Sequence, residues 1–312
     1  MALAFVFPGQ GSQSIGMLNA LAAEFPLVQQ TFAEASQVLG YDLWELVVTG
    51  PDDKLNQTQI TQPAMLAAGV AVWRVWESRN GPKPIVMAGH SLGEYSALVA
   101  ADVFTFADAI SLVADRARFM QEAVPVGQGA MAAVLGLDDE AVRKLCEQAA
   151  QGEVLEAVNY NSPGQIVIAG TATAVQRALE QAPAAGAKRA LPLPVSVPSH
   201  CALMHPAAER MTARLQQAAL AAPKVPVIHN VHVKTEAGLD AIREKLARQI
   251  EAPVRWVETI QKMADDGVTR IVECGPGKVL TGLNKRISKQ IETKAVFDPS
   301  SLRDVLVWTA QA

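Results

Sequence analysis

The sequence predicts an α/β protein with a mostly parallel central sheet. Three short apolar runs, each followed by a glycine-containing turn, are typical of buried strands: Leu3 to Phe7, Pro84 to Ala88 and Ile271 to Cys274. Helix-compatible stretches lie between these runs, and apolar strands that alternate with helices indicate a parallel sheet covered on both faces. The chain has 312 residues, half of them apolar, which suffices for one large core and a smaller second one.

The pattern changes between about residues 128 and 195, where shorter elements predict a second, smaller domain. Helices that begin near Asp138 and Thr173 alternate there with four strands: Ala130 to Leu135, Val154 to Val158, Gln165 to Ala169 and Arg189 to Val195. The run Asn161-Ser162-Pro163-Gly164 forms the turn between the middle two strands. The order βαββαβ is ferredoxin-like. We therefore predict a large α/β catalytic domain from residues 1–127 and 196–312, with a ferredoxin-like small domain inserted at residues 128–195.

Composition narrows the classes of partner and compartment. A formal net charge of −4 provides no overall basic field of the kind that attracts nucleic acid or anionic membranes. The longest apolar stretch, Met65 to Trp73, is far shorter than the roughly 20 residues of a membrane-spanning helix, and the first residues lack the basic region of an export signal. Cys146, Cys201 and Cys274 are widely spaced, which indicates reduced thiols. We expect a cytoplasmic protein with no nucleic-acid or membrane partner.

The segment Gly89-His90-Ser91-Leu92-Gly93 carries the clearest catalytic signal. It fits the pattern G-x-S-x-G directly after a predicted strand and before a helix-compatible segment, Glu94 to Ala101, which is the setting of a nucleophile elbow. Glycine is needed on both sides because a β-carbon would crowd this sharp turn. Ser91 would then be a nucleophile, and the backbone N–H of Leu92 at the helix N-terminus could stabilise an oxyanion. The alternative interpretation is a serine in an ordinary turn.

A serine hydroxyl needs a base to accept its proton, and the chain offers five histidines. His90 adjoins the serine and should point away from it, packing beside the elbow. His229 and His232, three residues apart on a strand-like run, should face opposite sides, which disfavours a shared metal site. His205 lies in a helix start or a loop. His200 follows a predicted apolar strand, where catalytic loops of α/β sheets gather, and is our predicted base. The alternative is a loop histidine with a structural hydrogen bond.

An arginine on the predicted helix Thr105 to Ala123 is a candidate for binding an anion. The apolar stripe of that helix leaves Arg116 about 80° from its centre and Arg118 about 120° away, at about 100° per residue. Arg116 therefore lies nearer the interior. A guanidinium binds a carboxylate through two parallel hydrogen bonds, which suits a dicarboxylic acyl group. The alternative is that Arg116 pairs with a carboxylate of the core.

Taken together, the motifs resemble those of the malonyl-CoA:acyl-carrier-protein transacylase family of bacterial fatty-acid synthesis. The resemblance covers nearly the whole chain, and several motifs in the family's order are far more specific than one elbow. These motifs are Phe7 to Gln13, Thr61 to Ala64, Gly89 to Tyr95, Asn161 to Gln165, Val197 to His200 and Gly275 to Gly277. The resemblance implies a sheet core like that of α/β-hydrolases.

The resemblance also implies how the reaction runs and which residues perform it. Ser91 would be the nucleophile, His200 its base and Arg116 the clamp on the malonyl carboxylate. The main-chain carbonyl of Gln249 would orient the histidine, replacing the acidic third member of a hydrolase triad. Malonyl would pass from CoA to the phosphopantetheine thiol of acyl carrier protein through an acyl-enzyme in a ping-pong reaction, with no permanently bound cofactor and no metal.

Further residues follow from the same resemblance. Gln10 and Leu92 would donate backbone N–H groups to an oxyanion hole. Gln62 would line the acyl pocket, and His90 would lie beside it.

A basic surface is expected because acyl carrier proteins are acidic. Lys285, Arg286 and Lys289 form one candidate cluster, and the pair Lys188-Arg189 forms another. Each cluster could equally be an ordinary solvated face. Two other functions compete with transfer: a serine thioesterase or esterase that hands the acyl group to water, and a noncatalytic scaffold that binds the carrier. The sequence leaves malonyl against methylmalonyl selectivity open.

Overall fold

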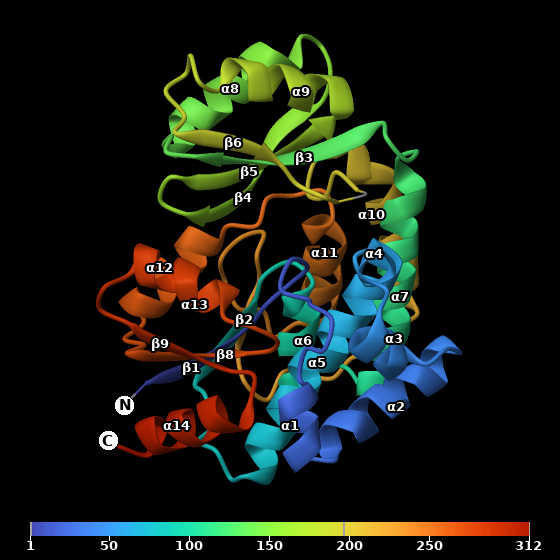
Figure 1. Ribbon diagram of the computed structural model, residues 1–312, viewed down its shortest axis with the longest axis vertical. Helices are drawn as coiled ribbons and strands as arrows, with labels where there is room; N and C mark the ends of the chain where they lie inside the picture. The colour runs from blue at the N-terminus through green and yellow to red at the C-terminus, as the bar shows by residue number, and fades with distance from the viewer. Residues whose placement is uncertain (1, 196, 312) are drawn as a thin grey trace.

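The computed structural model describes residues 2–195 and 197–311 and contains two sheets (Figure 1). Sheet A has five parallel strands in the order β7-β2-β1-β8-β9, and sheet B has four antiparallel strands in the order β4-β5-β3-β6. The strands are β1 Leu3–Phe7, β2 Val86–Gly89, β3 Gly129–Leu135, β4 Leu155–Ser162, β5 Gln165–Thr171, β6 Arg189–Pro192, β7 Val227–Ile228, β8 Arg270–Cys274 and β9 Glu292–Val296. The predicted α/β class with a parallel core is confirmed.

Helices cover both faces of sheet A, and none of those described is both long and apolar enough to cross a membrane. The helices of the described residues, those of sheet B included, are α1 Asn19–Glu24, α2 Leu27–Leu39, α3 Leu43–Thr49, α4 Asp52–Leu55, α5 Thr58–Ser78, α6 Gly93–Ala100, α7 Phe106–Ala123, α8 Asp139–Ala150, α9 Ala172–Gln181, α10 His205–Gln216, α11 Leu239–Gln249, α12 Trp256–Asp265, α13 Val279–Ile287 and α14 Pro299–Ala310, with a short 3₁₀ helix at Ala202–Met204. Helices α5 and α6 lie on one side of the sheet, and α12 and α13 lie on the other (Figure 1).

The central strand β1 explains why its sequence is apolar at every position. Successive side chains of a strand point to opposite faces of the sheet. Phe5 and Phe7 enter the core that also contains α5 and α6, whereas Ala4 and Val6 enter the core around Trp256 of α12. Because both faces are buried, a polar residue at either set of positions would lose its contact with water without a partner.

Sheet B and its helices α8 and α9 follow the predicted order βαββαβ and lie above sheet A in Figure 1. Two strand boundaries differ from the prediction by three or more residues. Strand β6 ends at Pro192 and not at Val195, because Pro192 and Pro194 have no N–H to donate to the ladder. Strand β4 continues to Ser162, which pairs with Gln165, so the turn is only two residues long.

The division into residues 1–127 with 196–312 and residues 128–195 remains a proposal. Residues 1, 196 and 312, which these ranges include, lie outside the described residues. The four strands of sheet B all fall within the smaller range, at residues 129–192.

The three cysteines are buried and unpaired, as expected for reduced thiols. Burial raises the pKa of the Cys146 and Cys201 thiols to about 12 and raises that of Cys274 as well. At ordinary pH the three cysteine side chains are therefore neutral, unreactive thiols.

Candidate active site

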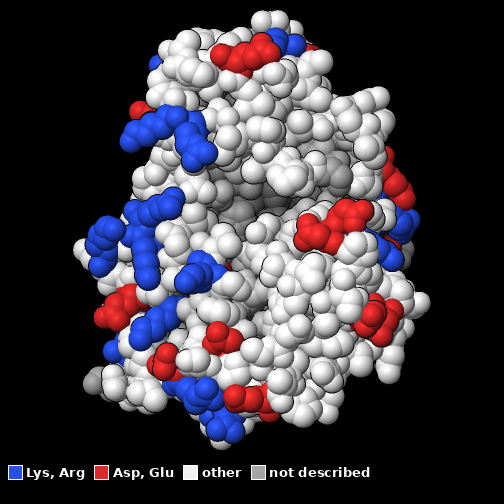
Figure 2. All heavy atoms as spheres, viewed as in Figure 1, with Lys and Arg blue, Asp and Glu red and all other residues white. Residues whose placement is uncertain are grey.

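A cavity lies where the carboxyl ends of β1 and β2 face sheet B, and Figure 2 shows the surface hollowed there. Gln10 follows β1 and Ser91 follows β2, while Met131 of β3 and Asn159 of β4 line the cavity from sheet B. The carboxyl edge of a parallel sheet is where ligands of α/β proteins bind. The cavity is lined by all the predicted site residues except Gln249: Gln10, Gln62, His90, Ser91, Leu92, Arg116 and His200.

Ser91 occupies the sharp turn that the sequence predicted between β2 and α6. Its φ of 51° is left-handed, a conformation that non-glycine residues rarely adopt and that is common at functional sites. A β-carbon on Gly89 would lie 1.9 Å from the backbone of Gly93, and one on Gly93 would lie 2.0 Å from the carbonyl oxygen of Phe7. The turn therefore excludes any side chain at these two positions.

Asn230, just after β7, braces the same turn. Its amide nitrogen donates to the Gly89 carbonyl oxygen at 2.7 Å, and its amide oxygen accepts from the Ser91 N–H at 2.7 Å. Sequence reasoning missed this residue. Its position immediately beyond a strand of the parallel sheet was the available signal, because such positions meet at one edge of the sheet.

Ser91 and His200 form a hydrogen-bonded pair that a backbone carbonyl orients. The Ser91 Oγ to His200 Nε2 distance is 2.7 Å, and His200 Nδ1 lies 2.7 Å from the main-chain oxygen of Gln249. A carbonyl can only accept, so the proton is on Nδ1 and Nε2 is free to take the serine proton. Burial, and then the positive charge of Arg116, lower the pKa of His200 to about 3. The imidazole is therefore neutral and ready to act as a base.

The lowered pKa of His200 predicts how acylation depends on pH. A base with a pKa of about 3 stays neutral as the pH falls from 7 to 5, whereas an unperturbed histidine with a pKa of about 6.5 would lose about 25-fold in its neutral form. We expect the rate constant for single-turnover acylation to change by less than about twofold over this range. Rapid-quench measurement at constant ionic strength tests this, and a 25-fold fall centred near pH 6.5 would contradict it.

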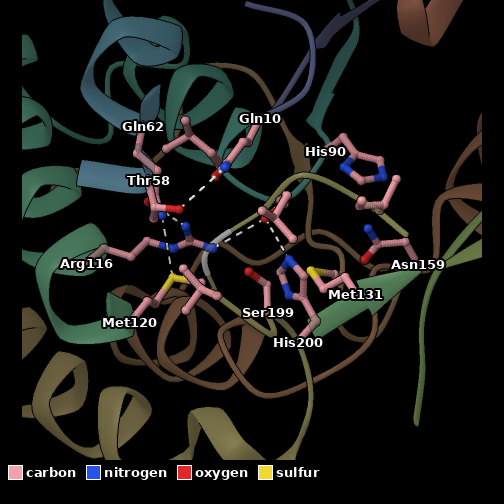
Figure 3. A pocket seen from close by; sticks show the side chains of 15 residues that line it. Gln10, Thr58, Gln62, His90, Arg116, Met120, Met131, Asn159, Ser199 and His200 are labelled. Atoms are coloured by element: carbon pink, nitrogen blue, oxygen red, sulfur yellow. Dashed lines mark hydrogen bonds between the residues drawn. The ribbon is translucent and has the colours of Figure 1, made fainter. Parts of the chain in front are cut away.

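Arg116 is buried on the wall of the same cavity. It is 1% exposed, whereas the Arg118 side chain is 47% exposed, as the helical periodicity predicted. Its Nη1 donates to Gln62 Oε1 at 2.6 Å, and its Nη2 donates to Gln249 Oε1 at 3.0 Å and to Ser91 Oγ at 3.3 Å. Figure 3 shows Arg116 and His200 pointing into one cavity.

The charge of Arg116 has no direct carboxylate partner among the described residues, since its hydrogen bonds go to two amides and a hydroxyl. Its Nε is buried and has no hydrogen bond to any residue within 2–195 and 197–311. Burial lowers the pKa of Arg116, and the nearby Tyr95 and Glu94 side chains partly offset this effect. A desolvated guanidinium beside the serine has the chemistry to bind a short acyl group that ends in a carboxylate.

The remaining predicted residues frame the serine. Gln10 and Leu92 line the cavity, and the Gln10 side chain lies 3.4 Å from the Thr58 hydroxyl. The Nε2 of His90 lies 2.7 Å from the Asn161 side-chain oxygen, and the ring of His90 packs 5.5 Å from that of Trp256, so it links the turn to strand β4. The use of the Gln10 and Leu92 N–H groups as an oxyanion hole stays a prediction.

The expectation that His229 and His232 face opposite sides was wrong. Strand β7 ends at Ile228, and the chain then turns, with the Val233 N–H donating to the His229 carbonyl. The two rings therefore lie 5.8 Å apart, centroid to centroid. His229 bonds Glu94 and His232 bonds Glu236. Within residues 2–195 and 197–311, no group of three or more histidine, cysteine or acidic side chains could hold a metal ion.

The predicted basic clusters lie at the surface beside the cavity. Figure 2 shows basic side chains gathered over α13 and β9 and, higher in the view, near the start of β6. Arg286 of α13 donates to the Gln165 side chain of β5 at 2.8 Å. Lys289 donates to the carbonyl oxygen of Lys285.

The sequence matches the family model of the acyl transferase domain over residues 4–300. It is 58% identical to the malonyl CoA-acyl carrier protein transacylase of Escherichia coli strain K12 over 303 residues, 97% of this chain and 98% of that protein. It is 45% identical to the enzyme of the same name from Bacillus subtilis strain 168 over 301 residues, 96% of this chain and 95% of that protein.

Solved structures of similar proteins superpose on nearly the whole of this chain. An acyl carrier protein S-malonyltransferase from Vibrio cholerae superposes with a TM-score of 0.95 at 58% identity, covering 98% of this chain and 100% of that one. A malonyl-transacylase in complex with a type II PKS acyl-carrier protein superposes with a TM-score of 0.97 at 56% identity, covering 98% of this chain and 99% of that one. With the serine elbow, the histidine and the buried arginine in one cavity, this chain belongs to the acyl transferase domain family, among the malonyl CoA-acyl carrier protein transacylases.

Proposed function

We propose that this protein transfers malonyl from CoA to the phosphopantetheine thiol of acyl carrier protein, as a step of fatty-acid biosynthesis. The observation that carries the proposal is the position of Arg116, whose Nη2 lies 3.3 Å from the Ser91 hydroxyl oxygen. In malonyl a single methylene carbon separates the carboxylate from the thioester carbonyl. A guanidinium this close to the nucleophile suits that short acid and would leave a longer acyl chain without room for its charge.

In the first half-reaction, Ser91 Oγ attacks the thioester carbon while His200 Nε2 takes the hydroxyl proton. The oxygen of the thioester gains negative charge, which the backbone N–H groups of Gln10 and Leu92, two residues that line the cavity, would stabilise. Collapse of this intermediate breaks the carbon–sulfur bond, and the His200 imidazolium gives its proton to the departing CoA sulfur. Malonyl is then an ester on Ser91.

In the second half-reaction the carrier's sulfur attacks the ester carbon while His200 takes the thiol proton. The bond between that carbon and Ser91 Oγ then breaks, and His200 returns a proton to the serine oxygen. The carbonyl of Gln249 stabilises the imidazolium without a full negative charge, so a serine–histidine dyad suffices. Water must be kept from the ester. Met131 and Asn159 of sheet B, which cover the cavity, would serve this purpose.

Transfer to a carrier is favoured over the thioesterase or esterase alternative. The family match and the curated relatives named as transacylases support transfer, and the hydrolase interpretation is set aside. The hydrogen-bond partner of His200 Nδ1 is the neutral carbonyl of Gln249, where a hydrolase triad has an acid. The cavity also contains the Arg116 guanidinium, which suits an acyl group with a carboxylate.

The proposal also covers where the carrier protein docks and in which compartment the protein acts. The exposed basic positions that would meet an acidic carrier are Lys285, Arg286 and Lys289, and the pair Lys188-Arg189. No permanently bound cofactor is needed, because malonyl-CoA is a substrate and both half-reactions use side chains of the chain itself. The free thiols suit a reducing compartment, and we propose the cytoplasm as the place of action.

Intact-protein mass spectrometry tests the proposed function directly. The protein is exposed briefly to malonyl-CoA, acetyl-CoA or methylmalonyl-CoA, and acyl carrier protein carrying its phosphopantetheine arm is then added. We expect a malonyl adduct on Ser91 that moves to the carrier, because Arg116 anchors the malonyl carboxylate. Loss of the adduct to water at one rate, with or without the carrier, would contradict transfer.

A further inference from the structure

A buried carboxylate lies behind the catalytic pair and has no part in the steps above. Glu94, in the first turn of α6, is 0% exposed. A carboxylate removed from water is costly unless donors satisfy both of its oxygens. The identity of those donors therefore indicates what the carboxylate does.

Three N–H groups reach the two oxygens of Glu94. His229 Nδ1 lies 2.7 Å from Oε1, while the backbone N–H of Asn230 and the side-chain Nε2 of Gln249 donate to Oε2 at 3.0 and 2.9 Å. An ionised carboxylate accepts hydrogen bonds and cannot donate them. It therefore compels Gln249 to present its NH₂ group on this side.

The orientation of the Gln249 amide decides what Arg116 meets. With its NH₂ donating to Glu94 and to the Ser91 carbonyl oxygen at 2.9 Å, Gln249 presents Oε1 to the Arg116 guanidinium at 3.0 Å. If the amide were rotated, its NH₂ group would face the Arg116 guanidinium, donor against donor, and its Oε1 would face Glu94 Oε2, acceptor against acceptor. The main-chain oxygen of Gln249 also holds His200, so one residue joins the clamp and the base.

We propose that Glu94 is a positioning residue for the malonyl carboxylate clamp, acting through the side-chain amide of Gln249. The inference rests on the proposed function, since it assumes that Arg116 binds the malonyl carboxylate. Glu94 accepts from Gln249, Gln249 accepts from Arg116, and the guanidinium is held facing the serine. Acetyl has no carboxylate and does not use this chain of contacts.

Two substitutions of Glu94 separate this role from general stability. Glu94→Met keeps the length of the side chain but removes the acceptor, and Glu94→Gln keeps an oxygen for Asn230 and Gln249 while its NH₂ donates to the other tautomer of His229. The measurement is kcat/KM for Ser91 acylation by malonyl-CoA and by acetyl-CoA. We expect the malonyl to acetyl ratio to fall about tenfold in Glu94→Met and to stay within about threefold of the unsubstituted protein in Glu94→Gln.

A second buried carboxylate provides the matched control. Glu273 is also 0% exposed, and it accepts from the backbone N–H groups of Leu280 and Thr281 at the start of α13. Glu273→Met should lower the melting temperature and leave the malonyl to acetyl ratio unchanged. Equal loss of both thioester activities in Glu94→Met, or an equally low ratio in Glu94→Gln, would overturn the proposal.

Two further comparisons keep the proposal testable if Glu94→Met folds poorly. Gln249→Leu removes the amide but keeps the main-chain oxygen that holds His200, so the ratio should fall as it does in Glu94→Met; an unchanged ratio would overturn the proposal. In an Arg116→Ala background, Gln249→Leu should alter the ratio by less than about twofold, and a fall as large as in the unsubstituted background would overturn the proposal. Failure of the function itself is distinct, because the unsubstituted protein would then form no malonyl adduct.

Discussion

Replacing Ser91 by alanine is expected to abolish the malonyl-enzyme and to lower malonyl transfer by about ten-thousand-fold to a million-fold. No other nucleophile lies within hydrogen-bond reach of His200 in the part of the chain that the structure describes. His200→Ala should be nearly as severe, because the hydroxyl then has no base. Since the two act as one unit, the double variant should be no worse than Ser91→Ala.

Mass spectrometry and steady-state transfer to the carrier protein measure these effects together. Ser78→Ala is a suitable control, because among the described residues the Ser78 hydroxyl bonds just the Val75 carbonyl oxygen at the end of α5. Melting temperatures should be similar for all variants, which excludes unfolding as the cause. Adduct formation in Ser91→Ala would refute the assignment of the nucleophile, and a normal burst in His200→Ala would refute that of the base.

Replacing Arg116 by alanine is expected to reverse acyl selectivity. Malonyl would bring its carboxylate into a cavity that no longer holds a cation, and loss of one partner from a buried charge pair costs about 2–5 kcal/mol. Acylation by malonyl-CoA should therefore fall by about 30-fold to several thousand-fold. Acylation by acetyl-CoA should rise, because the neutral acyl group no longer faces a desolvated guanidinium. Competition between the two thioesters, read by mass spectrometry, gives the ratio.

Arg118 provides the control for this experiment. It lies two residues further along α7, with its side chain exposed and bonded to Asp115, so Arg118→Ala should keep the selectivity for malonyl. A parallel fall for malonyl-CoA and acetyl-CoA in Arg116→Ala would indicate collapse of the cavity, and would contradict a clamp.

Features encoded over a few neighbouring residues could be predicted from the sequence. The apolar run Leu3 to Phe7 has no polar position, which is what a strand buried on both faces requires. The turn at Ser91 was recognisable because the strand, the two glycines and the helix follow one another directly. Burial of Arg116 followed from its angle to the apolar stripe of α7.

Features that depend on contacts between distant segments could not be predicted from local pattern. The hydrogen bond between Glu94 and Gln249 joins residues 155 apart, and nothing in the local sequence of either helix indicates that the two are in contact. The placement of His229 and His232 failed because strand β7 is only two residues long, so the alternation of a strand does not reach them. The length of strand β6 was overestimated because the prediction gave more weight to the apolar residues of the segment than to its prolines.

The strand order of sheet A has a consequence for how the protein is made. Strand β1 lies between β2 and β8, so it leaves the ribosome before both of its neighbours, one at residues 86–89 and the other at residues 270–274. At about 5–20 residues per second, the second neighbour is synthesised about 10–40 s after the first. During that interval the unpaired N–H and C=O groups along one edge of the central strand are open to pairing with other chains. Sheet B has no such delay, because residues 129–192 contain all four of its strands, and it can fold while the rest of the chain is still being synthesised.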